Sequence, residues 1–154
     1  MILKHIKPLP NLTLLDISDC ANITAKGIEA FGTHCKSLIH LKRNMWKSQK
    51  PSMHILDDSE AETIANTMPN IQRLEFFYAR FGDSGLSEIL NKCKSLTHLD
   101  IQSCWNVELR GDFNEICITE RLKSFIPPWY YGDSDSESEY AYESDKSESE
   151  SESG

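Results

Sequence analysis

The sequence predicts an α/β solenoid, in which short parallel strands form a curved inner sheet and helices lie outside it. A six-residue pattern with leucine or isoleucine at its first position and leucine at its fourth begins at Leu12, Leu38, Ile71 and Leu96. Successive copies therefore start 26, 33 and 25 residues apart. The agreement extends beyond this pattern, because residues elsewhere in the unit, such as the glycine and cysteine at 27 and 35, recur 58 residues later. Such self-similarity is typical of leucine-rich repeats.

The first unit shows what each repeat is expected to form. Between Leu12 and Ile17 the pattern predicts a short strand whose alternate side chains point inward, and Ile28 and Phe31 have the spacing of a short helix. One strand and one helix cannot bury both of their apolar faces alone. Four stacked units, just above the minimum of about three, are expected to share a core, with the parallel strands on the concave side.

The second unit departs from the others. Arg43 stands where the other units have isoleucine or phenylalanine, and about seven extra residues lie within positions 45–54. One interpretation is a tolerated surface loop, since lengthening a loop costs little entropy. The other is a contact patch formed by Arg43, Trp46 and Lys47, because arginine and tryptophan are frequent interface anchors.

The remaining units and both ends set the expected domain boundaries. Leu86, Ile89 and Leu90 predict a second helix, and a cover over the last repeat is expected from Leu122 to Ile126, before two prolines stop regular structure. We therefore expect about four leucine-rich repeats over 1–126, a proline- and aromatic-rich linker over 127–132 and a tail over 133–154. The start resembles the end of a preceding helix without its strand, which suggests an uncapped array and a fragment of a larger protein or assembly.

The tail is almost entirely serine, aspartate and glutamate. It holds nine acidic residues against the single Lys146, which leaves fifteen acidic and fifteen basic residues in 1–132. Too little apolar surface is present to offset the entropy of ordering, so disorder is expected. Serines followed by acidic residues suit an acidophilic kinase, and the candidate phosphorylation sites are Ser134, Ser136, Ser147, Ser149 and Ser151. A solvating tail without a dedicated partner is the alternative.

The repeat phase places the candidate binding residues on the concave side of the sheet. Outward strand positions group into three rows: Leu14, His40, Arg73 and His98; Asp16, Lys42, Glu75 and Asp100; Ser18, Asn44, Phe77 and Gln102. Their mixed charge favours a specific polar protein partner over an apolar peptide, and Phe77 is the expected exposed anchor.

No catalytic or metal chemistry is expected. The glycine, serine and histidine motifs of common enzyme classes are missing, and the adjacent His34 and Cys35 would point about 100° apart on a helix. The five cysteines are odd in number and lack a CxxC pair, so they are expected to be thiols that pack in the core. No cofactor, metal or nucleic acid is implied, because the folded part is neutral and no ligand set converges.

Four stretches resemble the cysteine-containing leucine-rich repeats of plant F-box proteins. They are LPNLTLLDISDC at 9–20, KRNMW at 42–46, IANTMP at 64–69 and CWNV at 104–107, and the resemblance covers about residues 2–126. In that family the F-box docks on Skp1 within a cullin-based SCF ubiquitin ligase, and the repeats hold the substrate for ubiquitin-dependent degradation. The resemblance thus implies a substrate-recognition module. No F-box precedes the repeats in this sequence, so Skp1 and cullin are expected as partners only if a longer form carries an F-box upstream.

Two further interpretations stay open. Leucine-rich repeats with an acidic tail also resemble the acidic nuclear phosphoprotein histone chaperones, which would imply basic partners such as histones. A truncated product without activity is the third. Since no apolar run is long enough for a membrane span or a signal peptide, we expect a soluble intracellular protein of the nucleus or cytoplasm.

Overall fold

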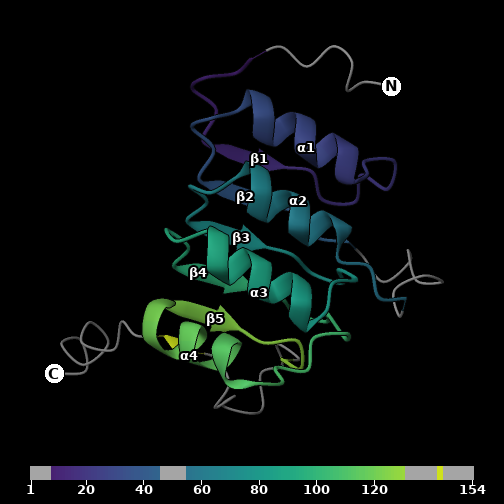
Figure 1. The fold of residues 1–154 in the computed structure, drawn as a ribbon. Helices are drawn as coiled ribbons and strands as arrows, with labels where there is room; N and C mark the ends of the chain where they lie inside the picture. Colours follow the sequence, from purple (N-terminus) through teal and green to yellow (C-terminus); the bar gives the residue numbers. More distant parts are fainter. Residues whose placement is uncertain (1–7, 46–54, 131–141, 144–154) are drawn as a thin grey trace, which may run out of the picture.

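The computed structural model describes residues 8–45, 55–130 and 142–143, which form a two-layer solenoid with strands on one side and helices on the other (Figure 1). The parallel strands are β1 (Leu14–Asp16), β2 (His40–Lys42), β3 (Arg73–Glu75), β4 (His98–Asp100) and β5 (Ser124–Ile126). The helices are α1 (Ala25–His34), α2 (Ser59–Thr67), α3 (Asp83–Lys92) and α4 (Asp112–Arg121). The predicted α/β leucine-rich-repeat solenoid is confirmed.

The strands pair in chain order, so equivalent residues of successive repeats lie side by side. Leu15 pairs with Leu41, Leu41 with Leu74, and Leu74 with Leu99. The last three of these leucines are fully buried beneath the helices, because their side chains point to the face that the helices cover. Burial of a leucine side chain is worth about 1.5–3 kcal/mol, so this ladder is a main source of the fold's stability.

Each helix contributes an apolar face to the same core. The buried helix residues include Ile28 in α1, Ile64 in α2, Ile89 in α3 and Ile118 in α4. Contacts between helices join neighbours in the stack, α1 with α2, α2 with α3 and α3 with α4. No helix in the described ranges is both long and apolar enough to cross a bilayer.

The sequence prediction stopped one strand short. Leu122 and Phe125 were expected to cover the last repeat, but Phe125 lies in β5 and pairs with Leu99, so these residues open a fifth unit. The two prolines expected to begin a linker are buried, and the carbonyl of Pro128 accepts a hydrogen bond from the backbone N–H of Ser103 at 2.8 Å. The repeat architecture therefore extends past 126, since a proline carbonyl can continue a ladder although proline has no N–H.

Part of the tail is also ordered into the sheet. β6 (Tyr142–Glu143) pairs antiparallel with β5, with Tyr142 opposite Phe125 and Glu143 opposite Ser124. Of the predicted tail 133–154, the structure describes these two residues alone. The five candidate phosphorylation sites, the predicted helix end at residues 1–7, and Trp46 and Lys47 of the insertion lie outside the described residues.

Candidate protein-binding surface

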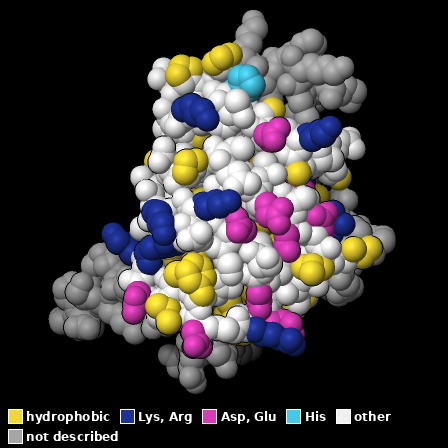
Figure 2. Space-filling view, in the orientation of Figure 1, with side chains coloured by type: hydrophobic (Ala, Val, Ile, Leu, Met, Phe, Trp, Pro, Cys, Tyr) yellow, Lys and Arg dark blue, Asp and Glu magenta, His cyan; other side chains and the backbone are white. Residues whose placement is uncertain are grey.

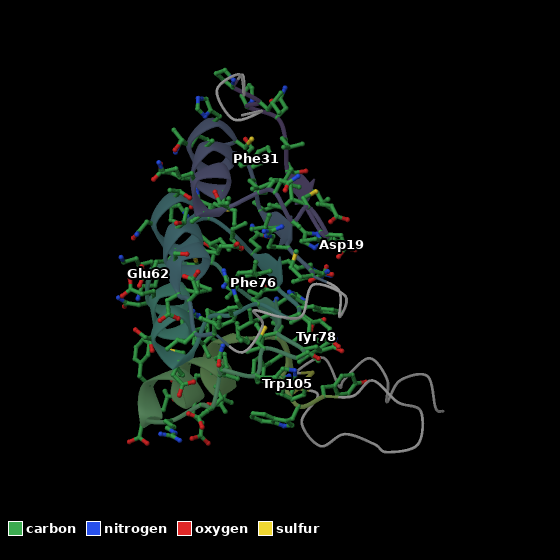
Figure 3. The ribbon with its side chains drawn as sticks, turned by 90° about the vertical axis from the view of Figure 1, so that its right-hand side faces the viewer. Asp19, Phe31, Glu62, Phe76, Tyr78 and Trp105 are labelled. Atoms are coloured by element: carbon green, nitrogen blue, oxygen red, sulfur yellow. The ribbon has the colours of Figure 1, made fainter. Side chains whose placement is uncertain are left out.

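The sheet has one face that the helices leave uncovered, which we call the open face (Figure 3). Its side chains come from the first and third residues of each strand. The pairing aligns Leu14, His40, Arg73 and His98 in one row, and Asp16, Lys42, Glu75 and Asp100 in the next. The strand alignment is therefore the one that the repeat phase indicated. Whether these residues bind a partner is taken up below.

Two neighbouring strands are joined across the open face by charge. Nε2 of His40 lies 2.8 Å from Oε2 of Glu75, and Nζ of Lys42 lies 4.0 Å from the same oxygen. All three side chains are partly exposed. Glu75 thus accepts from a histidine in the first row and faces a lysine in its own row, and these contacts fix its position on the open face.

The fourth strand carries two groups with shifted pKa values. Burial raises the pKa of the Asp100 carboxyl to about 6, against the lowering effect of hydrogen bonds that the backbone and side-chain N–H groups of Gln102 donate to it. Burial also lowers the pKa of His98, with a further contribution from the cationic Arg73 nearby. Near pH 6 this part of the open face therefore changes its charge with small changes in pH.

The third row is tied together through Asn44. Oγ of Ser18 accepts a hydrogen bond from the backbone N–H of Asn44, and Oδ1 of Asn44 accepts one from the backbone N–H of Phe77. Phe77 is partly buried, so the expectation of a freely exposed aromatic anchor is wrong. The largest exposed apolar side chain in the three rows is Leu14, which is 46% exposed.

Arg43 is buried, which contradicts its interpretation as part of a contact patch. Its side chain is 3% exposed, and Nε lies 3.1 Å from Oε1 of Glu60. Its two terminal nitrogens donate to the backbone carbonyls of Ile17, Cys20 and Ile23. Arginine takes the apolar position of the other repeats because its guanidinium can satisfy several carbonyls of the first turn while paired with a carboxylate.

The cysteines are free thiols, and their environments argue against catalysis. Burial raises the pKa of Cys35, Cys93 (to about 11) and Cys104, which is the opposite of what a nucleophilic thiolate requires. Nδ1 of His34 lies 2.8 Å from the carbonyl of Ala30 in its own helix. Cys20 is exposed, so packing accounts for most of these cysteines but not for this one.

No group of histidine, cysteine and acidic residues in the described ranges could hold a metal ion. A hollow of about 510 Å³ lies beside the turns that follow β1 and β3, and Ile23, Glu60 and Tyr78 line it. Met45 also lines it and is the last described residue before the insertion. The hollow therefore adjoins the insertion, and no ligand chemistry is assigned to it.

Two aspartates that anchor the turns were missed in the sequence. Oδ1 of Asp58 accepts from the backbone N–H groups of Gly82 and Gly85, 24 and 27 residues away. Asp83 accepts from three consecutive backbone N–H groups at residues 108–110. Both aspartates lie next to a helix start, which the sequence could have shown. Aspartate at that position usually caps its own helix, whereas these two accept hydrogen bonds from the next repeat.

Comparison with known proteins agrees with this architecture. A family model described as "Leucine Rich repeat" matches residues 9–32 and 92–111. In Arabidopsis thaliana, F-box protein FBW2 is 43% identical over 105 residues, covering 68% of this chain and 33% of that protein. Putative F-box/LRR-repeat protein 21 is 31% identical over 146 residues, covering 86% of this chain and 46% of that protein.

Fold and surface together define a leucine-rich-repeat protein, a non-enzymatic interaction module. With the relatives named above, the chain belongs to the plant F-box/leucine-rich-repeat proteins. It spans about a third to a half of the length of these two relatives.

Proposed function

We propose that the open face holds a substrate protein and that the chain provides the substrate-recognition part of an SCF-type ubiquitin ligase. The observation that carries this is the open face itself, where aligned rows of polar and charged side chains stay accessible on a rigid sheet. A surface of this kind suits recognition of one polar partner, since charge pairs fix register and specificity. The kinship to F-box/LRR proteins supplies the ligase context.

Two cations on the open face offer the sharpest test. Arg73 is exposed and Lys42 is partly exposed, so Lys42→Glu with Arg73→Glu should reverse local charge without disturbing the core. Lys26→Glu with Arg110→Glu is a matched control, because both residues are exposed and lie outside the strands. Each variant would be expressed in plant cells under proteasome inhibition, and captured proteins would be quantified by mass spectrometry.

Proteins retained by the control but lost from the open-face variant support the proposal. Equal capture by all three chains contradicts it. Recruitment of Skp1 and cullin is assigned to an F-box and not to the repeats. Purified Skp1 should therefore elute separately from this chain in gel filtration, and a stable complex would contradict that division of labour.

A further inference from the structure

The two rims of the solenoid differ in charge. Along one rim the chain passes from a helix to the next strand, over residues 34–40, 67–73, 92–98 and 121–124. These four connections contain no acidic residue. Their exposed cations are Lys36, Arg73, Lys92, Lys94 and Lys123, and Lys92 pairs with Glu88. We call the other four, Lys36, Arg73, Lys94 and Lys123, the basic rim. Figure 2 shows blue side chains gathered along the left of this face.

The opposite rim, where strands lead into helices, carries both signs of charge, since Arg80 and Arg110 lie there beside acidic residues. Asp57, Asp58 and Glu60 lie before or at the start of α2, and Asp83 begins α3. Figure 2 shows most of the magenta side chains at the centre and right of this view, with blue side chains among them. The neutral composition of the folded part thus conceals one rim whose connections carry only positive charge. A basic rim of this kind attracts an acidic partner, since like charges on neighbouring connections reinforce one another.

Three cations of the basic rim carry no carboxylate partner within the part of the chain that the structure describes. Lys36, Arg73 and Lys94 are exposed, and none of them forms an ion pair with a carboxylate in the described residues. The lowered pKa of His98, to which Arg73 and Lys123 both contribute, is consistent with positive charge gathered there. An acidic segment on this rim would relieve that repulsion.

The direction of β6 identifies the segment. Because β6 is antiparallel to β5, its second residue, Glu143, lies opposite Ser124, the first residue of β5. β6 therefore runs toward the basic rim, and its last residue, Glu143, lies in line with the row that contains Arg73 and His98. The eleven residues that remain, 144–154, include Asp145, Glu148, Glu150 and Glu152 against Lys146.

We propose that the basic rim is an intramolecular docking surface for the chain's own acidic segment 144–154. Charge complementarity supplies the attraction, and pairing of β6 with β5 keeps the segment close at high effective concentration. The docked tail would cover Arg73 and His98 at the edge of the open face, so a partner that uses these residues would compete with it. The docking itself requires no partner and does not depend on the proposed ligase function.

Carbodiimide coupling tests the contact directly, because it joins a lysine amine to a carboxylate that touches it. In the full chain, peptide mapping should find links from residues 145–152 to Lys94 and Lys123, with the same yield on tenfold dilution. Lys26 and Lys42, which lie away from the basic rim, are internal controls. Equal coupling of the tail to these two lysines, or a yield that falls with dilution, would overturn intramolecular docking.

A second measurement does not depend on coupling chemistry. Neutralising the tail with Asp145→Asn, Glu148→Gln, Glu150→Gln and Glu152→Gln should shift the amide resonances of residues 36–40 and 94–98 and leave those of 57–62 unchanged. Raising the salt from about 0.01 M to about 1 M shortens the screening length from about 30 Å to about 3 Å and should reproduce those shifts in the unaltered chain. Unchanged basic-rim resonances in both comparisons would refute the proposal. Equal affinity of an oligonucleotide for the basic rim of the unaltered chain and of the variant with the neutralised tail would also refute it.

Discussion

Nε2 of His40 and Oε2 of Glu75 lie 2.8 Å apart on adjacent strands, 35 positions from one another in the sequence. They are brought together because β2 and β3 are paired in register, with Lys42 opposite Glu75. The contact spans the junction at which the insertion separates two repeats. The open face is therefore continuous across the longest interval between repeats, and the consequences of this arrangement can be measured.

Loss of Arg43 is expected to be the most damaging polar change. Arg43→Ala would leave Glu60 without its cation and remove a side-chain donor from three backbone carbonyls. Removing one partner of a buried ion pair costs about 3–5 kcal/mol. Urea unfolding followed by circular dichroism should show that loss, with Arg73→Ala as the matched control that changes stability by less than about 0.5 kcal/mol. Equal midpoints for the two variants would show that Arg43 is not a structural residue.

Two phenylalanines test the fifth repeat. Phe125 is 4% exposed in β5, and Phe113 is 48% exposed on α4. Phe125→Ala should cost about 3–5 kcal/mol because it opens a cavity in the core. Phe113→Ala should cost under about 0.5 kcal/mol, since little of its surface is buried. A small effect of Phe125→Ala in thermal unfolding would mean that the core ends at β4.

Asp100 should make stability depend on pH. Its pKa in the folded chain is about 6, above the value of about 4 for an unfolded aspartate, so the folded state binds the proton more tightly. The contribution of Asp100 to the free energy of unfolding is therefore greatest below about pH 4, and it is lost as the pH rises through about 6. With allowance for solvent screening, the loss is about 1 kcal/mol.

The substitution Asp100→Asn isolates this effect, because asparagine can still accept from Gln102 but does not titrate. The difference in unfolding free energy between variant and unaltered chain should favour the variant by more at pH 7.5 than at pH 4.5. A constant difference across this range would contradict the raised pKa of Asp100.

Thiol reactivity should separate the cysteines. Cys20 is exposed, whereas Cys93 and Cys104 are buried with raised pKa values. Iodoacetamide at pH 8 should modify Cys20 in the folded chain and reach the other two only after denaturation, because the thiolate is the reactive form. Intact and peptide mass spectra report the order, and early modification of Cys104 would contradict its burial.

Most of the fold could be predicted from the sequence, because leucines at fixed offsets specify both the inward face and the pairing of parallel strands. The fifth strand escaped this reasoning because Phe125 and a buried proline replace the usual leucine and isoleucine. β6 escaped it because a serine-rich acidic segment gives no apolar signal. Both depend on contacts with β4 or β5 that local patterns do not contain.

The candidate surface was only partly predictable, for physical reasons that Arg43 and Phe77 illustrate. A charged residue at a repeat position can be an exposed contact residue or a buried structural one. For Arg43 the answer depends on the contacts with Glu60 and three backbone carbonyls, which the local sequence does not reveal. Phe77 follows a buried strand, but its exposure depends on how the next turn covers it. The basic rim could not be found from the net charge of the folded part, because that charge is summed over both rims.

Each described repeat is held by its immediate neighbours, and the backbone register repeats unchanged from β1 to β5. Removing one whole repeat would therefore bring two equivalent packing surfaces together. The contacts within and between the remaining repeats would stay the same. Family members can accordingly differ in length by complete units while each preserves its packing. Duplication or loss of whole repeats can then change the length of the open face during evolution without altering the core.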